Sequence, residues 1–185
     1  MSSLQKFHRR TNGGAPATVG PFASVGDGNN TVGYWVGSYA SNKLIVAPIS
    51  TETLLPFSPS NARVTSNTTD GLTNTNTLYS LGSAAAPAAY YCKTLATGGY
   101  NTWYLPAAKE LQSCMSNKSA TPFATANMFG LLTSSNYWSS TEKLGGYAGP
   151  KGVSVTVLGG YGIGGGSGPY KSAALLVRAI RRATV

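Results

Sequence analysis

The sequence predicts an α+β domain that follows an extended arm. Strand-like runs lie near the N-terminus and in the C-terminal third, and two segments with helical spacing lie together between them. Strands and helices segregated in this way are typical of an α+β fold rather than of alternating parallel β–α units. With 185 residues, the chain is long enough for one domain, which we place at residues 31–185 after an arm of residues 1–30.

The arm shows no helical or strand period. Gly, Pro and Asn are frequent there and interrupt any regular element. Such a segment is either disordered or ordered by a neighbouring molecule. We predict that it tethers the domain to an assembly through Lys6, Phe7, Arg9 and Arg10. A flexible tail without a partner is the alternative.

A β-hairpin is predicted directly after the arm. Residues 31–37 and 43–47 are rich in β-branched and aromatic residues, and residues 40–42 supply a turn between them. The following residues 58–83 are more than half Ser, Thr and Asn, and they show no apolar period. This composition predicts a long surface loop.

Two helices are predicted in the middle of the chain. The first covers residues 84–97, where apolar residues recur at near-helical spacing, and the second begins at Pro106 and carries a short apolar stripe. Cys92 and Cys114 lie on the apolar faces of these helices. Because we expect a reducing compartment, two buried free thiols are favoured over one disulfide bridge.

Three strands are predicted in the C-terminal third, at residues 136–140, 152–158 and 173–180. Residues 159–170 between the last two contain too much glycine for a strand or a helix, which predicts an exposed loop. Its glycine spacing matches the dinucleotide-binding fingerprint by letter. We reject that interpretation, because no helix start follows and no acidic residue occurs after Glu142.

The inventory of ionisable residues excludes most enzymatic chemistry. The chain has one histidine and five scattered acidic residues, whereas 14 Lys and Arg residues give a net charge of +9. A catalytic triad would have to recruit His8 from the arm, and the sequence has no short metal-ligand spacing. We therefore expect no enzymatic activity, no cofactor and no metal ion. No apolar stretch reaches the length of a membrane span and the start has no signal-peptide pattern, so we expect folding in a cytoplasm without membrane insertion.

Tyrosines and lysines in or beside the Gly-rich C-terminal segments are our candidates for ligand contacts. Tyr, Ser, Gly and Asn are typical of adaptable binding loops, in which rigid rings project from a permissive backbone. The predicted ligand-binding residues are Tyr147, Lys151, Tyr161, Tyr170 and Lys171. Ordinary exposed tyrosines in a protein with few charges are the alternative.

The basic C-terminus offers a second kind of binding surface. Its cationic side chains could neutralise nucleic-acid phosphates or acidic glycans: Lys171, Arg178, Arg181 and Arg182. The alternative is a solvated strand end, in which Arg178 pairs with one of the rare acids. No basic stripe with interleaved aromatic residues occurs, so sequence-specific binding of nucleic acid is not expected.

Several motifs, in order along the chain, resemble one known family. They are Gly33-Tyr34-Trp35, Trp103-Tyr104-Leu105-Pro106, Lys109-Glu110-Leu111, Tyr137-Trp138-Ser139-Ser140-Thr141-Glu142 and Val177-Arg178-Ala179-Ile180-Arg181. Over residues 31–182 the chain is similar to the Lcl C-terminal domain family, the adhesive end of collagen-like bacterial proteins, with similar domains in bacterial surface proteins and phage structural proteins.

The resemblance implies a C-type-lectin-like fold, with two helices packed on a small, looped, antiparallel sheet. The matching residues would be mostly scaffold, with Trp103 and Trp138 in the core. Calcium-dependent lectins of this fold use clustered acidic and amide ligands. Glu142 has no acidic neighbour in the sequence, so we expect no calcium-dependent sugar site.

These observations favour a non-enzymatic bacteriophage virion protein. Its lectin-like head would be anchored by the arm to other virion proteins of the capsid or tail, in several copies, and would adhere to a glycan or protein of the host surface. One alternative is a decoration, cement or tail structural subunit that stabilises the virion. A further alternative is a bacterial surface adhesin that binds polyanionic glycans through the basic C-terminus.

Overall fold

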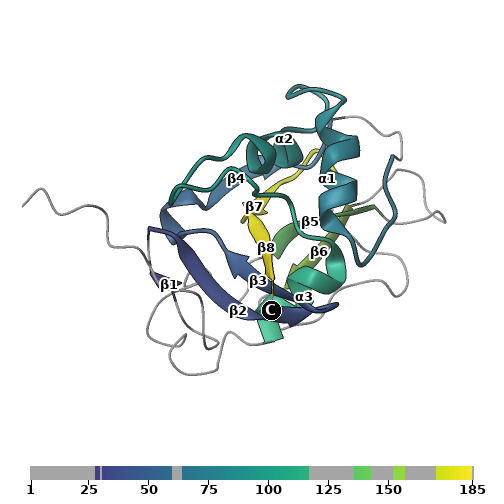
Figure 1. Ribbon diagram of the computed structural model, residues 1–185. Helices are drawn as coiled ribbons and strands as arrows, with labels where there is room; N and C mark the ends of the chain where they lie inside the picture. Colours follow the sequence, from purple (N-terminus) through teal and green to yellow (C-terminus); the bar gives the residue numbers. More distant parts are fainter. Residues whose placement is uncertain are drawn as a thin grey trace, which may run out of the picture.

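Three α-helices and two four-stranded sheets make up the described part of the chain (Figure 1). The computed structural model describes residues 28–29, 31–59, 64–116, 136–142, 152–156 and 170–184. The predicted α+β class is confirmed. The arm residues Lys6, Phe7, Arg9 and Arg10, and with them the predicted tether, lie outside the described residues.

The first sheet contains both ends of the described chain. Its order is β1-β2-β3-β8, and each strand is antiparallel to its neighbour. The strands are β1 (Gly28–Asn29), β2 (Gly33–Tyr39), β3 (Asn42–Val46) and β8 (Ile180–Thr184). Strands β2 and β3 confirm the predicted hairpin. Its two-residue turn places Ala40 and Ser41 at positive φ angles of 47° and 61°, which matches the right-handed twist of the flanking strands.

The second sheet is mixed. Its order is β4-β7-β5-β6, in which β5 and β7 are parallel and the other pairs are antiparallel. The strands are β4 (Thr53–Pro56), β5 (Asn136–Glu142), β6 (Gly152–Thr156) and β7 (Ala174–Val177). The expectation of a single small antiparallel sheet was therefore too simple.

The last two strands correct a prediction. Residues 173–180 were expected to form one strand, but β7 ends at Val177 in the second sheet and β8 begins at Ile180 in the first. The two residues between them bind the chain just after β3, since Ala47 N donates to Ala179 O over 3.0 Å and Arg178 Nε donates to Ala47 O over 2.7 Å. These long-range hydrogen bonds fix the crossing between the sheets.

The helices are α1 (Gly71–Tyr79), α2 (Pro87–Thr94) and α3 (Ala108–Ser116). Helices α1 and α2 pack against each other, and α3 lies beside β2 (Figure 1). The two predicted helices are confirmed as α2 and α3. Helix α2 is shorter than predicted and opens at Pro87, and α3 begins two residues after Pro106. None of the helices in the described part combines the length and the apolar character needed to span a bilayer.

Helix α1 lies within residues 58–83, where a loop was predicted, so that prediction is wrong for this part. The helix was missed because much of its buried face is polar. Asn74 Nδ2 donates to Asn67 O over 2.7 Å, and Thr75 Oγ1 donates to Leu105 O over 3.1 Å and accepts from Leu105 N over 3.0 Å. An apolar period cannot reveal a helix that is held by buried hydrogen bonds.

The core contains the residues that the motifs singled out. Trp103 and Trp138 are fully buried in one cluster, which confirms their predicted core position. Cys92 and Cys114 are buried and free, as predicted, and burial raises the pKa of both thiols. They are therefore poor nucleophiles in the folded protein.

Candidate functional site

The predicted ligand-binding residues have different outcomes. Tyr147, Lys151 and Tyr161 lie outside the described residues. Tyr170 is 60% exposed, as a contact residue should be. Lys171 corrects the prediction, because it is only 2% exposed and its ammonium group contacts Glu142. Its role in this fold is structural, since a buried and paired lysine has no surface for a ligand.

Glu142, at the end of β5, is the centre of a buried polar cluster. Its Oε2 accepts hydrogen bonds from Val64 N over 2.5 Å and Thr65 N over 2.6 Å, and its Oε1 contacts Lys171 Nζ. Its own N–H donates to Thr65 O over 3.2 Å. We call these four residues, Glu142, Lys171, Val64 and Thr65, the Glu142 hub.

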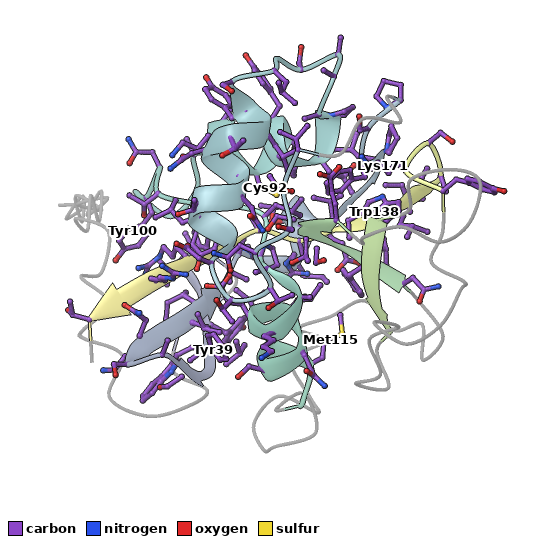
Figure 2. All side chains as sticks on the ribbon, turned by 90° about the vertical axis from the view of Figure 1, so that its right-hand side faces the viewer. Tyr39, Cys92, Tyr100, Met115, Trp138 and Lys171 are labelled. Carbon is purple, nitrogen blue, oxygen red and sulfur yellow. The ribbon has the colours of Figure 1, made fainter. Side chains whose placement is uncertain are left out.

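The hub lies against the aromatic core. Lys171 Nζ lies 5.5 Å from the centroid of the Phe57 ring, and this ring packs edge-on against Trp138 with centroids 5.7 Å apart. Figure 2 shows Lys171 and Trp138 on the same side of the molecule, away from Tyr39 and Tyr100. A low-polarity wall on one side strengthens the attraction between the buried charges.

Three further segments of the chain each have one end next to, or one residue from, a residue of the Glu142 hub. Residues 60–63 directly precede Val64, residues 143–151 directly follow Glu142, and residues 157–169 directly precede Tyr170, the neighbour of Lys171. The surface here carries apolar and aromatic side chains, since Val64 is 40% exposed and Tyr170 is 60% exposed. One buried ion pair therefore fixes where these segments join the scaffold.

The Ser-Ser-Thr part of the β5 motif forms hydrogen bonds with other segments of the chain. Ser140 N donates to Pro106 O over 2.7 Å, and Thr65 Oγ1 donates to Ser140 O over 2.8 Å. Thr141 Oγ1 donates to Asn67 O over 2.8 Å and accepts from Ala108 N over 3.0 Å. The predicted scaffold role of this motif is confirmed.

Glu110 is a second buried carboxylate with many donors. It is fully buried; its Oε2 accepts from Gly71 N over 3.0 Å and from Ala107 N over 2.9 Å. Its Oε1 accepts from Tyr104 Oη over 2.8 Å and from Arg182 Nη2 over 2.7 Å. Glu110 is the third residue of α3, so the bond to Ala107 N is the return half of a capping box.

Gly71 is required by the same cluster. A Cβ at this position would lie 2.4 Å from Ala107 N and 2.6 Å from Glu110 Oε2. Only glycine allows the start of α1 to approach α3 this closely. The acid of the Lys-Glu-Leu motif therefore joins two helices and the last strand.

The arginines of the C-terminus are committed to the fold. Arg178 is 1% exposed, and its Nη1 donates to Glu52 Oε2 over 3.0 Å. Arg181 is 4% exposed, and its guanidinium lies 3.6 Å from the centroid of the Tyr100 ring. Arg182 pairs with Glu110 and Asp70.

The expectation of a polyanion-binding surface on these residues is therefore wrong. Lys171, Arg178 and Arg181 are buried, and Arg182 is already neutralised by two carboxylates. Of the alternative, the pairing of Arg178 with one of the rare acids is confirmed, whereas the solvated strand end is wrong, because Arg178 and Arg181 are buried. Burial lowers the pKa of Arg178, and Glu52 opposes this effect.

All four acids in the described ranges have structural partners. Glu52 and Glu142 bind Arg178 and Lys171, and Glu110 and Asp70 share Arg182. Within the same ranges no group of three or more His, Cys, Asp or Glu side chains could hold a metal ion. These carboxylates stabilise the scaffold and are occupied by their partners.

Asp70 should make the stability of the fold depend on pH in acid. It caps α1 by accepting from Thr73 N over 3.2 Å and from Thr73 Oγ1 over 2.6 Å, and it pairs with Arg182. Partial burial opposes ionisation, but the hydrogen bonds from Thr73 and the charge of Arg182 outweigh it, so the pKa of Asp70 lies below its ordinary 3.8.

The stabilisation from ionised Asp70 is therefore present above about pH 3.8 and is lost as pH falls through the lower folded pKa. We expect Asp70→Asn to cost up to about 1 kcal/mol at neutral pH, because asparagine can still cap α1 and the lost contribution is that of a partly exposed ion pair with Arg182. The variant should also lose part of the acid dependence. Urea unfolding of both proteins between neutral pH and pH 3 measures this. Parallel stability curves over that range would contradict the assignment.

The sequence did not predict that Glu110 and Glu142 each lie at the centre of a buried cluster. One signal was available, because Glu110 and Glu142 each lie inside a motif of the resembling family in a chain with only five acids. Their partners were not visible, since Glu110 and Arg182 are 72 residues apart in sequence.

Comparison with known proteins identifies the family. The family model of the Lcl C-terminal domain matches residues 49–181, more than half of the chain. No curated protein and no solved structure matches the chain, so the C-type-lectin-like fold stays a prediction. Strands β1, β2 and β3 precede the matched residues, and β8 continues beyond them. The match contains both buried carboxylates, Glu110 and Glu142, and their motifs, and the chain belongs to the Lcl C-terminal domain family.

Proposed function

We propose that this chain is a non-enzymatic adhesion domain, carried on a bacteriophage virion, whose binding surface is built around the Glu142 hub. The observation that carries the proposal is the convergence of three segment ends on one buried ion pair. A rigid scaffold that holds several chain segments at one place is a common way to build a binding surface.

The allocation of charges supports binding rather than catalysis. The four described acids are all used in structural ion pairs. Two of the residues near the hub that reach the surface are apolar or aromatic, namely Val64 and Tyr170. Tyrosine provides a large contact area at low entropic cost, which suits recognition of a glycan or a protein.

Placement on a virion is supported by composition. Only 10% of the residues are charged, against about 25% in typical soluble domains. Such a surface suits a protein that is largely covered by neighbours. The cationic arm residues Lys6, Arg9 and Arg10 would make the contact with other virion proteins, in a particle that carries several copies.

Deletion of residues 159–168 should abolish adsorption of the particles to host cells while the particles still assemble. Within the described residues, Tyr170→Ala should lower adsorption roughly 30-fold, the effect of losing one aromatic hot spot of about 2 kcal/mol. The matched control is Tyr79→Ala, because Tyr79 is 37% exposed on α1.

Adsorption counts and particle yields measure both effects. Unchanged adsorption of the deletion particles would contradict the recognition assignment. If removal of residues 1–27 left the protein on the particle, the anchoring role of the arm would be wrong.

A further inference from the structure

The contact between Glu142 and Lys171 has the features of a site for covalent cross-linking. Both side chains are 1% exposed, and Lys171 Nζ contacts Glu142 Oε1. Despite this contact, Oε1 accepts no hydrogen bond from any described residue.

The surroundings of the two groups are largely apolar. The Phe57 ring lies 5.5 Å from Lys171 Nζ, and Trp138, which packs on Phe57, is fully buried. A buried carboxylate and a buried ammonium group both lose hydration, so transfer of one proton between them costs much less than it would in water. This transfer produces an amine next to a carboxylic acid.

The other carboxyl oxygen lies in a position to accept negative charge. Glu142 Oε2 is held by Val64 N at 2.5 Å and Thr65 N at 2.6 Å. Two backbone N–H groups directed at one oxygen are the arrangement that stabilises the tetrahedral intermediate of acyl transfer.

We propose that Lys171 and Glu142 condense into an amide, which forms an isopeptide cross-link within the chain. A proton first passes from Lys171 Nζ to Glu142 Oε1. The amine lone pair then attacks Cδ, the N–C bond forms, and the negative charge moves to Oε2. A second proton passes from the nitrogen to Oε1, the C–Oε1 bond breaks, and Oε1 leaves as one molecule of water. No oxidant, reductant or co-reactant takes part.

Geometry supplies the acceleration and the lifetime of the bond. Two reactive groups held in contact react as if at very high concentration, with effective molarities of about 10⁵ M or more in well-oriented cases. Burial also limits the access of the water that would hydrolyse the product.

The bond would join the end of β5 to the segment before β7 and close a loop over residues 142–171. Such closure lowers the conformational entropy of the unfolded chain, as a disulfide bridge does. Residues 143–151 and 157–169 lie within this loop, next to Glu142 and Tyr170. The covalent bond would then fix the distance between these two attachment points. This inference concerns the scaffold and does not depend on what the domain binds.

The intact mass of the purified full chain, measured under denaturing conditions, tests the proposal. We expect the mass of the sequence minus one water molecule, and a proteolytic fragment in which Lys171 is joined to Glu142. Lys171→Arg should restore the full mass, because a guanidinium keeps the positive charge but is not a nucleophile. The matched control Lys109→Arg, at an exposed lysine of α3, should keep the loss of water.

The proposal is overturned if the wild-type chain has the full mass of its sequence after prolonged incubation in the folded state. It is equally overturned if Lys171→Arg still lacks one water, since the dehydration would then lie at another residue. Because the wild-type mass decides the question, a variant that fails to fold does not obscure the answer.

Discussion

Removal of residues 1–48 should leave a chain that does not fold, although the family match begins at residue 49. The deletion removes strands β2 and β3, and with them four core side chains that are fully buried: Val36, Leu44, Ile45 and Val46. Each contributes about 1.5–3 kcal/mol when buried, so the loss of about 6–12 kcal/mol approaches the whole stability of a typical domain, about 5–15 kcal/mol.

The same deletion leaves other groups without partners. Strand β8 pairs with β3 along its length, and Arg178 Nε donates to Ala47 O. Circular dichroism and limited proteolysis of the truncated chain measure the outcome. Removal of residues 1–27 alone is the control, because it keeps every described strand, and it should leave the melting temperature unchanged. Cooperative thermal unfolding of residues 49–185 would contradict the prediction.

Glu110→Ala should destabilise the fold by about 3–5 kcal/mol, the usual cost of breaking a buried ion pair from one side. The substitution removes the acceptor for Gly71 N, Ala107 N and the Tyr104 hydroxyl. These buried donors would then lack partners. Each unsatisfied buried donor lowers the free energy of unfolding by about 1–3 kcal/mol. The cost arises from the groups left behind more than from the lost attraction to Arg182.

Asp70→Asn provides the matched comparison, because Asp70 pairs with the same Arg182 but its side chain is 35% exposed. Its loss should cost about 1 kcal/mol or less. The free energy of unfolding in urea distinguishes the two variants at neutral pH. Equal losses in both would show that the attraction to Arg182, rather than the buried donors, makes Glu110 important. Glu110→Gln should lie between the two, since it keeps one acceptor oxygen.

The elements that the sequence predicted well have local causes. The hairpin of β2 and β3, the helices α2 and α3, and the strands β5 and β6 follow from runs of β-branched or aromatic residues or from apolar spacing. The failures have long-range causes. Helix α1 is held by polar contacts to other segments, and the chain between β7 and β8 is turned by the bond from Arg178 to Ala47.

The candidate site shows the same division. Tyr170 was predicted as an exposed contact from its Gly-rich neighbourhood, and its exposure agrees with this. Lys171, one residue further, was predicted as a contact on the same grounds and is buried against Glu142. No local pattern separates the two, because neighbouring residues point in different directions and only the packed fold decides which of them faces water.

The sequence by itself determined the α+β class, the buried tryptophans and thiols, and membership of the Lcl C-terminal domain family, because periodicity and motif spacing record local geometry. Only the tertiary structure decided the role of each charge. Glu142 with Lys171 and Glu110 with Arg182 meet across the fold, the latter pair 72 residues apart. From the sequence alone, a charged residue is predicted to face solvent. Whether it forms a buried ion pair depends on partners that the chain brings together only when it folds.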